Sequence, residues 1–239
     1  MKKLLFAAAV TASFLSVSSC VGIKKPEAAE KREQWVESLN DSIARYKAQA
    51  DSASEQLNLL RSRIGEMIPD FDHISNAREV EGYYIYKGWS ARYPLTSTNL
   101  VARISENEGL ELIAALSGGV FDRISVSSGG NSVSSAIVPH DQALNYRAGN
   151  INTVCFTGAQ ADSVAAFIAD APGAVSVSFI GGAKNASLSL SSSSKEMIAA
   201  TWRLYAAQKE SHSLEKLLPL LSRKVDLCRR MLHENDSTK

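Results

Sequence analysis

An aromatic-rich segment, residues 83–94, carries the side chains best suited to contact a ligand. Exposed rings can stack on sugar faces or anchor a protein interface. Successive side chains of a strand point to opposite faces, so if Tyr83 faces a core, Tyr84 and Tyr86 face outward. We therefore take Tyr84, Tyr86 and Trp89 as candidate ligand or partner contacts. The alternative is a strand whose rings form core and cross-strand pairs.

Motifs that could support catalysis are sparse. His140 and Asp141 place an imidazole beside a carboxylate, but neighbours in a strand point to opposite faces, so we expect a surface turn. Residues 157–162 have one glycine and no phosphate-binding lysine, which favours a simple strand-to-helix turn. The serine-rich residues 187–194 contain no nucleophile elbow. The sequence therefore predicts no catalytic residue, metal site or cofactor.

The N-terminus has the pattern of an export signal. Lys2 and Lys3 precede an apolar run of roughly 14 residues, shorter than the roughly 20 that a membrane-spanning helix needs. The run ends in Val17-Ser18-Ser19-Cys20, which resembles the lipobox of bacterial lipoprotein precursors. The resemblance implies cleavage before Cys20, acylation of its thiol with palmitate among the acyl groups, and attachment to membrane lipid. An ordinary signal peptide with an incidental cysteine is the alternative.

Composition limits the remaining possibilities. The formal net charge of +1 gives no reason to expect nucleic-acid binding. Export would permit a disulfide between Cys155 and Cys228, but their predicted positions are far apart, so we expect two thiols. Neither cysteine has the paired spacing of a zinc site.

Two long helical segments flank the middle of the chain. Residues 26–69 and 193–234 both carry apolar side chains at alternating steps of three and four, the pattern of a coiled-coil seam. The second seam is irregular between Gln208 and Leu214 and contains Pro219, which predicts a kink or a break. A capping box at Ser193 predicts where this helix begins. The first seam comprises Val36, Leu39, Ile43, Tyr46, Ala50, Ala53, Leu57, Leu60, Ile64 and Met67.

Helices of similar length on either side of one insertion predict an antiparallel hairpin. If pairing begins where the two helices meet the insertion, Leu60 lies near Thr201 and Cys228 lies near Glu33. A parallel oligomer through the first helix, and helices that pack back over the middle region, are the alternatives.

The middle of the chain, residues 70–192, alternates short β-rich runs with glycine doublets. This texture predicts a mostly antiparallel β-rich head with one helix near residues 160–169. The run 110–116 could be a strand or a helix. The strands are expected at 83–87, 99–105, 110–116, 121–127, 132–138, 151–157, 175–180 and 187–190.

The predicted fold class is therefore α+β, with the β-rich head inserted between two coiled-coil helices. The predicted boundaries are a signal peptide at 1–19, a lipid-anchored linker at 20–25, helices at 26–69 and 193–234, a head at 70–192 and a disordered tail at 235–239. Basic residues near the predicted membrane end could contact anionic headgroups, and the candidates are Lys24, Lys25, Arg229 and Arg230.

We expect a lipid-anchored protein on the periplasmic or cell-surface face of the cell envelope. Its head would recognise or assemble with an envelope protein or a glycan, without catalysis. A hydrolase, a carbohydrate-binding or carbohydrate-processing head, and an oligomeric coiled-coil envelope adaptor are the alternatives. The pattern does not decide the oligomeric state.

Overall fold

The computed structural model describes residues 25–75, 82–107, 109–141, 143–182 and 186–236. The predicted signal peptide, Cys20 and Lys24 lie outside these residues, as do the last three residues of the predicted tail. The chain divides into two compact units, one formed by residues up to Ala48 with those from Ser222 onward, the other by Gln49–Leu221. No helix in the described ranges is both long enough and apolar enough to cross a membrane.

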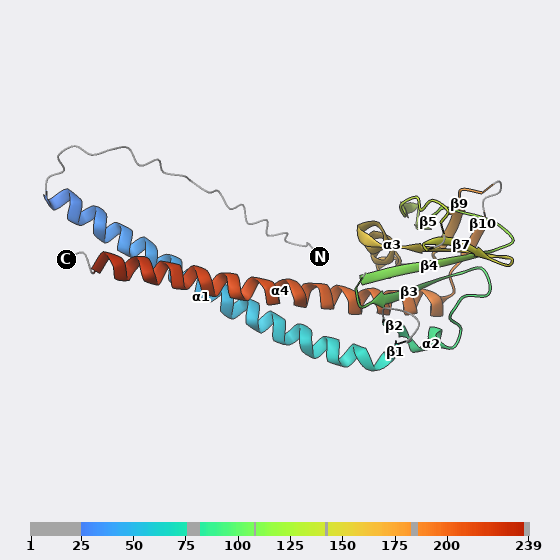
Figure 1. The fold of residues 1–239 in the computed structure, drawn as a ribbon, viewed down its shortest axis with the longest axis horizontal. Helices are drawn as coiled ribbons and strands as arrows, with labels where there is room; N and C mark the ends of the chain where they lie inside the picture. The colour runs from blue at the N-terminus through green and yellow to red at the C-terminus, as the bar shows by residue number, and fades with distance from the viewer. Residues whose placement is uncertain (1–24, 76–81, 108, 142, 183–185, 237–239) are drawn as a thin grey trace. The chain divides into compact units, whose positions relative to one another are not determined.

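Two long helices, α1 (Lys25–Met67) and α4 (Ser192–Asp236), pack together as the predicted antiparallel pair (Figure 1). Every residue of the predicted α1 seam is buried or half-buried, because the alternating three and four steps keep one stripe facing the partner helix. Helix α1 ends at Met67, and Pro69 lies in a short 3-10 helix, η1 (Ile68–Asp70).

Helix α4 corrects three details of the sequence reading. Ser211 is only 7% exposed, so the seam continues through the stretch that looks irregular in the sequence. The helix also continues through Pro219, so the expected break is wrong. Its start is capped by Ser191 rather than by Ser193. The Ser191 hydroxyl accepts a hydrogen bond from the Ser194 backbone N–H at 3.0 Å.

The predicted register of the helix pair is wrong by several turns. In the Gln49–Leu221 unit, the Arg61 guanidinium donates to the Glu215 carboxylate at 2.9 Å, whereas the prediction pairs Arg61 with a residue near 200. In the other unit, the Lys224 ammonium lies 5.2 Å from the centre of the Tyr46 ring. The shift arises because the first turns of α4 are packed in the head, so pairing with α1 begins further along.

The head contains two antiparallel sheets (Figure 1). The six-stranded sheet has the order β1-β2-β3-β4-β8-β7, and the four-stranded sheet has the order β10-β9-β5-β6. The strands are β1 (Phe71–Ile74), β2 (Tyr83–Tyr86), β3 (Asn99–Ser105), β4 (Gly109–Ser117), β5 (Arg123–Ser128), β6 (Asn131–Ser134), β7 (Asn145–Ala148), β8 (Ile151–Phe156), β9 (Ser176–Ile180) and β10 (Ala186–Ser189).

Two helices complete the head. Helix α3 (Gly158–Asp170) is the predicted internal helix, and the four-residue α2 (Lys87–Ser90) was not predicted. The main core gathers the inward side chains of both sheets with α3 and α4, including Phe179, Ile198 and Leu204. A smaller core covers the other face of the six-stranded sheet around Ile85 and Trp89.

Strand β4 settles the open alternative for residues 110–116. Seven consecutive residues of this strand are buried, because both faces of the six-stranded sheet are covered there. A strand covered on both sides loses the usual alternation and resembles a buried helix in sequence. The missed strands, β1 and β7, are the two short edge strands of the same sheet.

Candidate functional site

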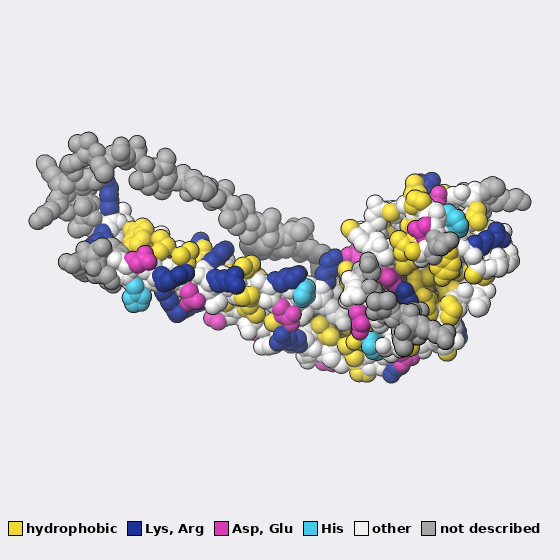
Figure 2. Space-filling model, in the orientation of Figure 1, with side chains coloured by type: hydrophobic (Ala, Val, Ile, Leu, Met, Phe, Trp, Pro, Cys, Tyr) yellow, Lys and Arg dark blue, Asp and Glu magenta, His cyan; other side chains and the backbone are white. Residues whose placement is uncertain are grey.

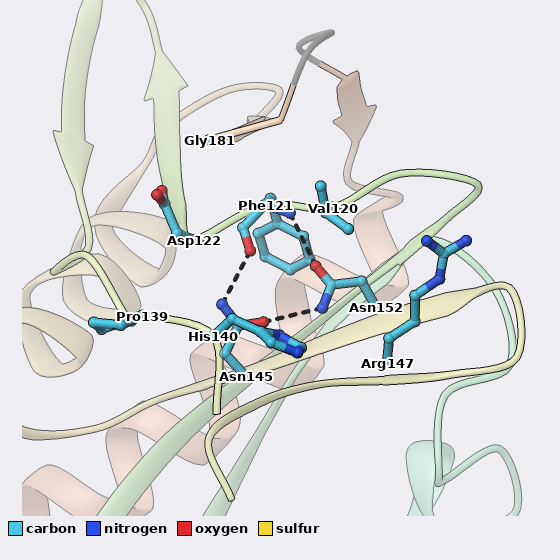
Figure 3. Close-up of a pocket in the computed structure, with 9 residues that line it drawn as sticks. All are labelled: Val120, Phe121, Asp122, Pro139, His140, Asn145, Arg147, Asn152 and Gly181. Carbon is cyan, nitrogen blue, oxygen red and sulfur yellow. Dashed lines mark hydrogen bonds between the residues drawn. The ribbon is translucent and has the colours of Figure 1, made fainter. Parts of the chain in front are cut away.

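A pocket in the head lies where the two sheets meet (Figure 3). We call it the head pocket, and its volume is about 390 Å³. Strands β7 and β8 of the six-stranded sheet supply part of its wall, and the segments next to β5 and β9 of the four-stranded sheet supply the rest. It is lined by Val120, Phe121, Asp122, Pro139, His140, Asn145, Arg147, Asn152 and Gly181.

Two buried asparagines form its floor. Asn145 and Asn152 are 2% and 1% exposed. The Asn145 amide donates to the backbone carbonyls of Phe121 at 3.2 Å and of Val138 at 2.7 Å. It therefore ties strand β7 to the segments on both sides of the β5–β6 hairpin.

Asn152 completes this network. Its carbonyl accepts the Phe121 backbone N–H at 2.9 Å, and its amide donates to the Asn145 side-chain oxygen and to the Tyr146 backbone carbonyl, both at 3.0 Å. Figure 3 shows these two amides meeting beneath Phe121. Because both N–H bonds of each amide already have acceptors, the pair gives the pocket a fixed floor instead of contacts for a ligand.

A glycine doublet closes one side of the pocket. Gly181 has a φ of +119°, and a Cβ at this position would lie 2.5 Å from the Asp122 carboxyl group. A Cβ on Gly182 would lie 2.3 Å from the Val120 carbonyl oxygen. The chain can approach the Val120–Asp122 segment this closely only without side chains.

Three ionisable side chains remain for a ligand, namely Asp122, His140 and Arg147. His140 is exposed, and one oxygen of Asp122 is buried without a hydrogen-bond partner. The Arg147 Nε–H donates to the Gly149 carbonyl at 3.1 Å, which directs its guanidinium along the rim.

The neighbouring Asp141 is held mainly by backbone N–H groups, with His140 as a minor electrostatic neighbour. Its carboxylate accepts the backbone N–H groups of Ala143, Leu144 and Asn145 at 2.8, 2.6 and 3.1 Å. These bonds, first among them that of Leu144, hold the pKa of Asp141 below its ordinary value. The pair therefore lies in a turn, as the sequence indicated, and the turn positions Asn145 in the pocket floor.

Two exposed apolar side chains belong to the segments that line the head pocket. Val120 in its wall is 48% exposed, and Ile137, two residues before Pro139, is 57% exposed. Leu144 and Tyr146 are each 39% exposed, but they are out of phase with Asn145 and Arg147 and face the other side of the six-stranded sheet. Apolar side chains are visible on the surface of the head between charged ones (Figure 2). Exposed apolar side chains beside a few fixed polar groups are typical of a binding site.

The aromatic segment is mostly part of the core. Trp89 is 2% exposed, so its predicted role as an exposed contact is wrong. Tyr83 and Ile85 face the smaller core, and Tyr84 and Tyr86 point to the opposite face as predicted. That face is also covered, and both rings are only half-exposed against the main core. None of these residues lines the head pocket.

The rings of Tyr83 and Tyr93 instead pack against the side chain of Arg103. The Arg103 guanidinium lies 4.3 Å from the centre of the Tyr83 ring and 5.5 Å from that of Tyr93, and it donates to the Tyr93 hydroxyl at 3.1 Å. Glu111 on the adjacent strand forms an ion pair with it. Burial raises the pKa of Tyr93 above its ordinary value despite the nearby Arg103. This cluster stabilises the pairing of β3 with β4.

The basic residues proposed for lipid contact are only partly described. Lys24 lies outside the described residues, and the structure does not describe the side chain of Lys25. Arg229 lies 3.5 Å from the Asp226 carboxylate on the same helix, and Arg230 is exposed. Cys155 on β8 and Cys228 on α4 are not joined in a disulfide, as predicted.

The head pocket was missed from the sequence, although one signal pointed to it. Asn152 has the same phase as Val154 and Phe156 on β8, so an amide occupies a position where alternation predicts an apolar residue. Within the described ranges, no group of three or more His, Cys, Asp or Glu side chains is arranged to hold a metal ion.

Comparison with known proteins adds no further identification. No family model matches the chain, and neither a curated protein nor a solved structure matches it.

Proposed function

We propose that the chain is a lipid-anchored envelope protein whose head is a recognition module for a protein partner, without catalysis. The observation that carries the recognition role is the head pocket, in which a hydrogen-bonded amide floor lies below the exposed side chain of Val120, with exposed Ile137 in an adjoining segment. The lipobox resemblance at Cys20 supports the anchor.

A protein partner suits the pocket better than a small charged substrate does. Full burial of an aliphatic side chain contributes about 1.5–3 kcal/mol, so Val120 and Ile137 together offer appreciable affinity. Arg147 can pair with a carboxylate of the partner, and Asp122 can accept a hydrogen bond from it. The floor is held in place before binding, which reduces the entropic cost of association.

The anchor is tested by replacing Cys20 with alanine. The wild-type protein should enter the detergent phase and incorporate labelled palmitate, whereas Cys20→Ala should do neither. Equal partitioning of the two proteins, with label in neither, would refute the anchor.

Recognition is tested by photo-crosslinking in intact cells. A photoreactive amino acid at Ile137 should give one reproducible cross-linked protein, because this side chain adjoins the pocket. The same amino acid at Gln160, an exposed position on α3, serves as the control. Identical cross-linking patterns from the two positions would contradict a partner site at the head pocket.

A further inference from the structure

The outer face of the four-stranded sheet carries an ordered array of hydroxyl groups. The strand register places serines opposite one another on all four strands. One row across the sheet is Ser187, Ser178, Ser125 and Ser134, in the order β10-β9-β5-β6. The next row is Ser189, Ser176, Ser127 and Ser132. We call these eight residues the serine face.

The serine face is open to solvent and uncharged at all eight positions. The four serines on the central strands β9 and β5 are half-exposed, and the four on the edge strands are exposed. The intervening residues of the central strands, among them Ile124, Val126 and Val177, are fully buried on the opposite side of the sheet, and Val133 and Leu188 of the edge strands are half-buried there. The array therefore results from strict alternation in four adjacent strands, with serine at every outward position of the two rows.

One end of the serine face is hollowed. A depression of about 500 Å³ is lined by the second row together with the β5–β6 turn and the start of β9. Ser128 also lines it. This residue is 9% exposed, and its hydroxyl is buried without a hydrogen-bond partner. Ser128 is in phase with Val126 on β5, so its hydroxyl faces the buried side of the sheet, and the groups open to a ligand in the hollow are those of the second row and the β5–β6 turn.

We propose that the serine face and this hollow bind a neutral carbohydrate. Each serine hydroxyl can both donate and accept a hydrogen bond, and so can each hydroxyl of a sugar. Serines on adjacent strands are about 4.8 Å apart, and serines two residues apart along a strand are about 6.8 Å apart, so the array can engage successive sugar units of an extended glycan.

The composition of the site argues against other occupants. The eight side chains supply no charge to attract an ionic ligand. They also offer little apolar area, which a stable interface with a second copy of the chain needs at its centre. The hollow lies at the opposite end of β5 and β9 from the head pocket, so this proposal does not rest on the proposed function.

The test is native affinity electrophoresis of the full chain in gels that contain dextran, mannan or a β-1,3-glucan. At least one polysaccharide should retard the wild-type protein. Ser127→Ala with Ser176→Ala should raise the apparent Kd at least fivefold. Threonine at the same two positions keeps the hydroxyls and favours strands, so it should retain binding. Ser52→Ala with Ser54→Ala, both exposed on α1, is the matched control.

Three results would overturn the proposal. The first is the absence of retardation of the wild-type protein in all three gels. The second is equal retardation of the wild-type protein and the alanine pair, with circular dichroism showing that both are folded. The third is a wild-type dimer in sedimentation velocity that dissociates when Ser127 and Ser176 are replaced by lysine, because the face would then be an interface between copies.

Discussion

Removal of the Asn152 side chain tests whether the pocket floor is a connected polar network. In Asn152→Ala, the Phe121 N–H and the Asn145 side-chain oxygen lose their partner, whereas the Tyr146 carbonyl stays paired with Thr153 in the ladder. An unsatisfied buried polar group costs about 1–3 kcal/mol, so two of them at the lower end predict a loss of about 2 kcal/mol. For a chain of this size, that loss lowers the melting temperature by about 4–8 °C.

The matched control is Asn150→Ala in the same hairpin. The Asn150 amide makes one exposed hydrogen bond, to the Ser117 hydroxyl at 3.3 Å. Its removal should cost about 0.5 kcal/mol or less, as is usual for surface positions. Urea unfolding followed by circular dichroism, with both variants and the parent in the Cys20→Ala background, gives the two free energies. If the two variants lose equal stability, the network does not hold the pocket floor as described.

Three further predictions follow from the same structure. Gly181→Ala should destabilise the head by about 1–3 kcal/mol in urea unfolding, because its backbone is left-handed, whereas Gly173→Ala, with no atom near its Cβ, should change stability little. The depressed pKa of Asp141 stabilises the fold above the ordinary aspartate pKa, and this contribution is lost as pH falls through the folded-state value. The melting-temperature advantage of the wild type over Asp141→Asn should therefore shrink from pH 6 to pH 3, and a constant difference would contradict the assignment. In the helix pair, the contact between Lys224 and Tyr46 places Cys228 opposite the stretch 39–46 of α1. Single cysteines at positions 39–46 should therefore form an intrachain disulfide with Cys228. Links found only near position 33 would instead support the register predicted from sequence.

The sequence predicted the elements with strong periodicity. The α1 seam was clear because steps of three and four continue over more than four heptads, and β5 and β9 were clear because each alternates serine with an apolar residue. These patterns depend on local side-chain phase, which a single sequence displays. The α+β class with a helix pair and an inserted head followed from them.

Features that depend on contacts between distant residues were not predictable in this way. The helix register depends on how many turns of α4 the head takes up, and nothing in the sequence separates Ile198 and Leu204, which belong to the main core, from the apolar residues that face α1. The pocket floor joins Phe121 to Asn145 and Asn152 across the boundary between two sheets. Edge strands such as β1 are short and partly exposed, so they give little signal.

The most direct test of the central claim is the affinity of the cross-linked partner, once purified, for wild-type protein and pocket variants. Isothermal titration calorimetry at fixed ionic strength would compare three proteins. They are the wild type, a double variant that combines His140→Ala and Arg147→Ala, and the control Asn150→Ala. The proposal predicts that the double pocket variant raises the Kd at least about tenfold, as expected when residues central to an interface are truncated. The Asn150 variant should bind like the wild type. Equal Kd values for all three proteins would show that the head pocket is not the recognition site.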